Sequence, residues 1–268
     1  MKQIELRMQE VLNRGEKVLV SGVPIGYPDL DTTRRIVEIY IRSGIDVVEF
    51  SMASPNPYID TKIIADSNIK ALQEEPALDK HLDALCKIRN DFPDEPFYMM
   101  AYADFIRPLG VSRFMAGLKG IGVDAFELPD RDEDVPELAA DLDAQLERAN
   151  IYRTYILHHP FDLKFFDRIK RKAHGFVLLQ SIANEVGLRP RVAPENQHII
   201  ESIRQAGLAA KIILGYGINK PERVREAAAT GADGVIVGTA MIEWINIGDY
   251  DGMSRFIRSM KDATLPAK

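Results

Sequence analysis

Short apolar segments rich in strand-forming residues alternate with longer helical patterns eight times along the 268-residue chain. This alternation is typical of βα units, which build a parallel sheet covered by helices. The predicted strands span residues 17–23, 45–51, 96–102, 123–128, 151–158, 175–180, 210–215 and 233–237. Eight such units in a chain of this length predict an α/β fold, a single (β/α)8 TIM barrel that forms one domain over residues 1–268.

The helical segments carry their own start and stop signals. Asp31 precedes Thr32 and Thr33 at the start of the helix after the first strand, and Gly44 is expected to end that helix. Asn219 is expected to cap a later helix whose first turn holds Pro221.

Composition restricts the partners of the chain. A formal net charge of -6 argues against binding to nucleic acid or to an anionic membrane, so we expect a small-molecule partner. The chain has one cysteine, Cys86, and no apolar run of the length that a signal peptide or a membrane span requires. We therefore expect a cytoplasmic protein.

Two glycine loops follow the seventh and eighth predicted strands. Gly215 and Gly217 flank Tyr216 in the first loop, and Gly238 precedes Thr239 in the second. In (β/α)8 barrels the paired loops after these two strands commonly bind phosphate through backbone amides at a helix N-terminus. Such glycines can also serve only to make tight turns, but their presence in both loops favours a phosphate site.

Two carboxylates are candidates for acid–base chemistry. Glu49 ends the second predicted strand among residues that are expected to be buried, and burial would raise its pKa toward neutrality. Asp60 lies eleven residues later, in the long loop 51–61, where it could close over a ligand held by Glu49. A structural ion pair or a helix cap is the alternative role for Asp60.

Other catalytic chemistries find less support. Lys17 and Lys211 stand at the N-terminal ends of their predicted strands, so no lysine stands at the catalytic end of a strand, which disfavours a Schiff-base aldolase. His158 and His159 could hold a divalent metal together with Glu127, as in a metal-assisted phosphosugar epimerase or aldolase. We favour a structural role in which one histidine points inward and makes a hydrogen bond while the other faces the helices, and we expect no bound metal.

Several motifs recur in the order of a known family. They are Gly26–Tyr27–Pro28, Asp46–Val47–Val48–Glu49, Asn56–Pro57–Tyr58–Ile59–Asp60, Tyr102, Gly122–Val123–Asp124, Gly215–Tyr216–Gly217–Ile218 and Gly234–Val235–Ile236–Val237–Gly238–Thr239–Ala240. From about residue 10 to residue 247 the chain resembles the tryptophan synthase α subunit family.

The resemblance implies a carbon–carbon lyase that cleaves indole-3-glycerol phosphate to indole and glyceraldehyde 3-phosphate without metal or organic cofactor. It implies that Glu49 is the general acid and base and that Asp60 accepts the ring N–H and stabilises the cationic intermediate. The implied phosphate-binding residues are Gly187, Gly215, Gly217, Gly238 and Thr239.

The pocket for the aromatic ring departs from the family pattern. The chain has Gly22 where the family usually has an aromatic residue, Glu127 where it has an apolar one, and Leu178 where a tyrosine is usual. These positions and Tyr102 are the expected substrate-binding residues. A buried glutamate beside an apolar ring would be costly without a partner, so we expect weak cleavage of indole-3-glycerol phosphate or a more polar substrate.

The loop Ser51–Pro57 also departs, at positions that the α subunit uses against its β partner. This argues against association with a β-type partner, while association with further copies of the same chain stays open. A catalytically silent member that binds a phosphorylated metabolite is a third interpretation. Retention of both Glu49 and Asp60 argues against a silent member, because burying Glu49 is costly.

Overall fold

The computed structural model describes residues 1–158, 161–181, 192–193 and 195–266. Nine parallel strands form one sheet in the order β5-β4-β3-β2-β1-β9-β8-β7-β6. The strands are β1 (Val18–Pro24), β2 (Val47–Ser51), β3 (Phe97–Met100), β4 (Ala125–Glu127), β5 (Tyr152–Thr154), β6 (Ile156–Leu157), β7 (Phe176–Gln180), β8 (Lys211–Gly215) and β9 (Gly234–Val237).

The two edges of this sheet meet, because β5 and β6 are successive pieces of one segment separated only by Tyr155. β5 pairs with β4 and β6 pairs with β7, while the amide of Leu178 donates to the Tyr155 carbonyl at 2.9 Å. The segment 151–158 therefore serves as the fifth strand of a closed barrel. The predicted (β/α)8 barrel is confirmed, and each predicted strand lies within a few residues of an observed one.

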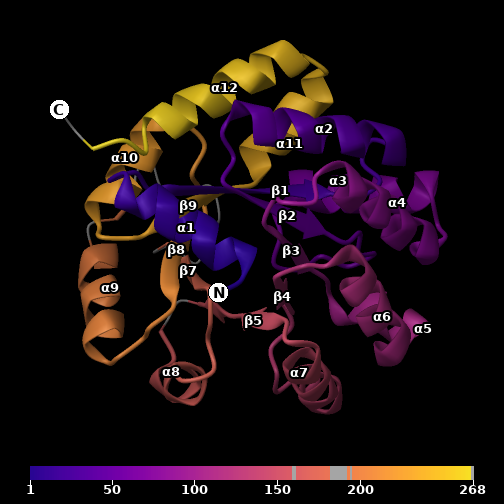
Figure 1. The fold of residues 1–268 in the computed structure, drawn as a ribbon, viewed down its shortest axis with the longest axis horizontal. Helices are drawn as coiled ribbons and strands as arrows, with labels where there is room; N and C mark the ends of the chain where they lie inside the picture. The colour runs from indigo at the N-terminus through magenta and orange to yellow at the C-terminus, as the bar shows by residue number, and fades with distance from the viewer. Residues whose placement is uncertain (159–160, 182–191, 194, 267–268) are drawn as a thin grey trace.

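Helices surround the barrel on all sides (Figure 1). They are α1 (Gln3–Asn13), α2 (Leu30–Ser43), α3 (Lys62–Glu74), α4 (Leu78–Asp91), α5 (Ala103–Leu109), α6 (Val111–Ile121), α7 (Pro136–Ala149), α8 (Leu163–Ile169), α9 (Glu195–Gln205), α10 (Pro221–Ala229), α11 (Thr239–Ile247) and α12 (Tyr250–Asp262). Within the described ranges, none combines the length and the hydropathy of a membrane span.

Two expected helix starts are corrected by the structure. The N-cap of α2 is Asp29, whose side chain accepts from the Thr32 amide, so the helix begins before Asp31; Gly44 ends it with a φ of 111°. The N-cap of α10 is Lys220, because the extended backbone continues past Asn219, and no side chain caps this helix. Asn219 instead lines a cavity inside the rim of the barrel.

Helix α1 closes the N-terminal end of the barrel (Figure 1). Its buried face, formed by Ile4, Met8 and Val11, belongs to the same apolar cluster as inward residues such as Val20 and Phe176. Since all strands run in parallel away from this plug, their C-terminal ends form the opposite, open face of the barrel.

The close approach of β1 and β9 depends on a glycine. A Cβ at Gly234 would lie 2.4 Å from the Val18 carbonyl oxygen and 2.7 Å from Ile213 Cδ1. We predict that Gly234→Ala lowers the free energy of unfolding by about 1–3 kcal/mol, because the Val18 carbonyl oxygen is a backbone atom that cannot yield without moving the barrel wall. Urea denaturation measures this loss.

Gly120→Ala is the matched control. A Cβ there would lie 3.8 Å from Cys86 Sγ, an ordinary contact, within the helix α6. This variant should be as stable as the parent or more stable by up to about 1 kcal/mol. Equal effects of the two substitutions would contradict the close-contact explanation.

Candidate active site

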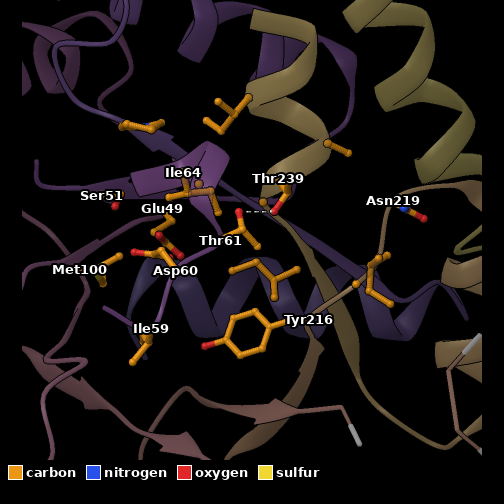
Figure 2. Close-up of a pocket in the computed structure, with 18 of the residues that line it drawn as sticks. Glu49, Ser51, Ile59, Asp60, Thr61, Ile64, Met100, Tyr216, Asn219 and Thr239 are labelled. Carbon is orange, nitrogen blue, oxygen red and sulfur yellow. Dashed lines mark hydrogen bonds between the residues drawn. The ribbon is translucent and has the colours of Figure 1, made fainter. Parts of the chain in front are cut away.

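A cavity of about 320 Å³ opens at the C-terminal ends of the strands (Figure 2). Its size suits a small organic ligand. The sequence-predicted residues that line it are Gly22, Glu49, Asp60, Glu127, Leu178, Gly217, Gly238 and Thr239. The site therefore brings together both candidate carboxylates and residues of both glycine loops. It also includes three of the four expected substrate-binding residues, Gly22, Glu127 and Leu178.

Glu49 projects from β2 into the base of this cavity, with only 7% of its surface exposed. It stands in register with Gly22 on β1 and Tyr98 on β3, and the Tyr98 hydroxyl donates to its Oε2. A Cβ at Gly22 would lie 2.9 Å from Glu49 Oε1. The Glu49 carboxyl group therefore stands where a side chain at position 22 would lie, while Gly22 itself still lines the cavity.

The environment of Glu49 favours its neutral form. Burial, with a smaller contribution from the nearby charge of Asp60, raises the pKa of Glu49 to about 7 despite the hydrogen bond from Tyr98. A carboxyl group with this pKa can both donate and accept a proton near neutral pH.

Asp60 enters the cavity from the loop between β2 and α3 (Figure 2). Its Oδ2 accepts from the Tyr102 hydroxyl at 2.8 Å, and burial raises its pKa to about 6. Asp60 is not the cap of α3, because the N-cap residue of that helix is Thr61. Tyr102 does not line the cavity; it contacts the site through Asp60.

Glu127 is the third carboxyl group of the cavity. It ends β4, is 3% exposed, and its Oε2 has no hydrogen-bond partner among the described residues. Burial, followed by the charges of Glu49 and Asp60, raises the pKa of Glu127 well above its ordinary value. Burial therefore favours the protonated form of Glu127, whose proton would be available to a ligand.

The glycine loops form the other end of the cavity. Gly217 has a φ of 79°, which favours glycine, and Gly238 with Thr239 forms the N-terminus of α11. The Thr239 hydroxyl lies 3.0 Å from that of Thr61, which ties the loop after β2 to this end. No lysine or arginine of the described chain lines the cavity, so an anion here would rely on amides, hydroxyls and the helix dipole.

Two predicted phosphate residues are not placed at the cavity. Gly215 does not line it, and a Cβ at Gly215 would lie 2.5 Å from Ile236 Cγ2, so this glycine allows the close packing of β8 and β9. Gly187 lies outside the described residues.

His158 faces a second cavity of about 370 Å³, lined also by Arg131 and Phe161. Burial lowers the pKa of His158, and a hydrogen bond with Gln180 offsets part of this effect. The part of the chain that the structure describes contains no group of three His, Cys, Asp or Glu side chains that could hold a metal ion. His159 lies outside that part.

Sequence reasoning missed Tyr98, Ser51, Met100 and Tyr216, all of which contact the carboxyl groups or line the cavity. For Tyr98 and Met100 a signal was available, because alternate residues of β3 face the barrel interior on the same side as Glu49 and Glu127.

The fold and the cavity define a TIM barrel with a carboxyl-rich ligand site on its catalytic face, the usual arrangement of a small-molecule enzyme of this fold. A family model described as "Tryptophan synthase alpha chain" matches residues 8–262. The chain belongs to the tryptophan synthase alpha chain family.

Individual relatives agree with this assignment. The tryptophan synthase alpha chain of Geobacter sp. (strain M21) is 30% identical over 271 residues, covering 99% of this chain and 98% of the relative. A solved structure from Aquifex aeolicus VF5 superposes with a TM-score of 0.88 at 24% identity, covering 99% and 100% of the two chains. The structure of tryptophan synthase subunit alpha from Legionella pneumophila superposes with a TM-score of 0.85 at 23% identity, covering 98% of each chain. At these identities the structures show the fold alone.

The raised pKa values predict how stability depends on pH. A carboxyl group with a raised pKa binds its proton more tightly in the folded than in the unfolded chain, so its ionisation destabilises the fold as pH rises. For Glu49 this loss begins near 4.5 and continues to about 7, and Glu127 shifts in the same direction.

We predict that the free energy of unfolding falls between about pH 5 and pH 8. Glu127→Gln should reduce this fall, because the amide does not ionise and one buried group with a raised pKa is lost. Urea denaturation across this range provides the measurement. Asp66→Asn, on the exposed face of α3, should retain the parent slope. A Glu127→Gln slope equal to that of the parent would show that Glu127 ionises without penalty.

Proposed function

We propose that the chain is a carbon–carbon lyase that cleaves indole-3-glycerol phosphate, or a related phosphorylated compound, by retro-aldol chemistry without metal or organic cofactor. The observation that carries the proposal is the position of two carboxyl groups, the buried Glu49 and the half-buried Asp60, in one cavity that ends at the N-terminus of α11. The relatives named tryptophan synthase alpha chain support the reaction class.

Each carboxyl group has a distinct role in this reaction. Glu49, with a pKa raised by burial to about 7, protonates the carbon at which the bond will break and takes the proton of the neighbouring hydroxyl group. Asp60 has the lower pKa, about 6, so at neutral pH it is the group that carries negative charge and stabilises a cationic ring. The carbon–carbon bond then breaks, its electron pair returns to the ring, and an aldehyde leaves.

The phosphate group of the substrate binds at Gly217, Gly238 and Thr239 in this proposal. Amides at the start of α11 point toward the cavity end, and the helix dipole favours an anion there. Fixing the phosphate positions the scissile bond against Glu49, which is the main contribution that such a remote group makes to catalysis.

We predict that Glu49→Gln lowers indole release from indole-3-glycerol phosphate by at least about 100-fold, because the amide can neither donate nor accept the transferred proton. The substitution preserves size and a hydrogen bond with Tyr98, so affinity for inorganic phosphate should stay within about twofold of the parent.

Asp66→Asn, an exposed change on α3, is the control for this experiment and should retain parental turnover. If Glu49→Gln turns over at the parental rate, Glu49 is not the acid–base group. If the parent itself releases no indole yet binds phosphate, the chain is either a non-catalytic binder or an enzyme for another phosphorylated substrate, and product analysis with that substrate separates the two.

We further propose that the chain works without a β-type partner. In the loop after β2, the Ser54 hydroxyl donates to Asp104 at 2.8 Å and the Ser54 amide donates to Asn68 at 3.1 Å, so this loop packs on its own barrel. On mixing with a bacterial tryptophan synthase β chain, size-exclusion chromatography should show the two proteins eluting separately. Co-elution would contradict this proposal.

A further inference from the structure

Three buried polar groups that have no hydrogen-bond partner among the described residues lie on one layer of the barrel. They are Ser51 Oγ, Glu127 Oε2 and Thr154 Oγ1, on β2, β4 and β5. The strand registers pair Ser51 with Met100, Met100 with Glu127, and Glu127 with Thr154, so all four residues stand side by side across successive strands. Residues in register project to the same side of a sheet.

The polar side chains of this layer are buried. Ser51 is 4%, Glu127 3% and Thr154 1% exposed, so water cannot readily satisfy them. A buried donor or acceptor without a partner is destabilising, and native proteins keep few of them away from functional sites. Ser51 and Glu127 line the cavity directly, which places their free hydrogen-bonding capacity in contact with a ligand.

The layer lies at the end of the cavity away from the phosphate site. Figure 2 shows Ser51 and Met100 on one side of the pocket and Thr239 and Asn219 on the other. A substrate whose phosphate binds at Thr239 therefore extends its other end toward Ser51 and Glu127. A flat apolar ring at this end would leave all three polar groups unpartnered, at a cost that a hydroxyl- or carbonyl-bearing group avoids.

Resting on the lyase function above, we propose that the substrate is a hydroxylated carbonyl compound with a terminal phosphate, of the ketose phosphate class, and that Glu127 hydrogen-bonds its carbonyl oxygen. Ser51 bonds a neighbouring hydroxyl group. Thr154 does not line the cavity but stands beside Glu127 in the strand register, where it bonds the Glu127 carboxyl group. Glu127 is then the residue that selects this substrate over an indole.

The same contact supplies the electron sink that an indole ring would otherwise provide. Glu49 takes the proton from the hydroxyl group two carbons from the carbonyl carbon, and the bond between the hydroxyl carbon and the carbon next to the carbonyl breaks. Its electron pair passes to the carbonyl oxygen, which receives the proton of Glu127. The products are a phosphorylated aldehyde and an enol that tautomerises to a ketone, and a proton passing from Glu49 to Glu127 restores the enzyme.

Isothermal titration calorimetry with two phosphate monoesters tests this inference. Fructose 6-phosphate carries its carbonyl group at the end remote from phosphate, and 3-indolepropanol phosphate carries an apolar ring there. We expect the protein to bind fructose 6-phosphate at least about tenfold more tightly. Glu127→Leu should reverse this order, and Glu127→Gln, which still donates a hydrogen bond, should keep it.

Ser51→Ala is an independent test. Loss of one hydroxyl group should weaken the binding of fructose 6-phosphate and leave the affinity for 3-indolepropanol phosphate unchanged. Asp66→Asn should change neither affinity. Tighter binding of the indole compound, or equal binding of the two, to the parent protein would overturn the inference while leaving the phosphate site and the lyase proposal intact. Failure of both esters and of inorganic phosphate to bind would instead overturn the proposed phosphate site, on which the inference rests.

Discussion

The burial of carboxyl groups in one small cavity is the constraint on which the site depends. Glu49 and Glu127 are buried, and Asp60 enters the same cavity half-buried. Burial raises the pKa of all three groups; the charge of Asp60 adds to this effect at Glu49, and the charges of Glu49 and Asp60 add to it at Glu127. Hydrogen bonds offset the cost of ionisation at two of them, because Tyr98 donates to Glu49 and Tyr102 donates to Asp60. Glu127 Oε2 has no such donor among the described residues, and the pKa of Glu127 is raised well above its ordinary value.

Barrel geometry creates this set. Parallel strands in register align Gly22, Glu49 and Tyr98 in one layer, and the absence of a side chain at Gly22 leaves the volume that the Glu49 carboxyl group fills. The next layer toward the open face aligns Ser51 with Glu127. The loop after β2 then adds Asp60 from above, and the contact between Thr61 and Thr239 ties that loop to the phosphate end.

Much of this arrangement could be predicted from the sequence, because it depends on local periodicity and on motif spacing. The strand alternation predicted the barrel, and the positions of Glu49 and Asp60 predicted that both carboxyl groups would face one cavity. Other features depend on contacts between segments distant in sequence. Gly22 replaces an aromatic residue that is usual in the family, and only the structure shows that the side chain of its cross-strand neighbour Glu49 stands where a side chain at position 22 would lie. Gly215 was expected to bind phosphate, but it does not line the cavity and instead allows β8 to pack closely on β9. Asn219 was expected to cap α10, but the N-cap of that helix is Lys220. The missing partners of Ser51 and Thr154 could be identified only when every neighbouring side chain was placed.

The buried Glu127 carboxyl group, whose Oε2 has no hydrogen-bond partner among the described residues, should hold its proton to a higher pH than an ordinary glutamate does. Carbon-13 NMR of side-chain carboxyl-labelled glutamate, with Glu127→Gln to assign the signal, measures this directly. We expect the Glu127 resonance to keep its protonated chemical shift at pH values well above 4.5. A Glu127 resonance that titrates near 4.5, the ordinary glutamate value, would contradict it.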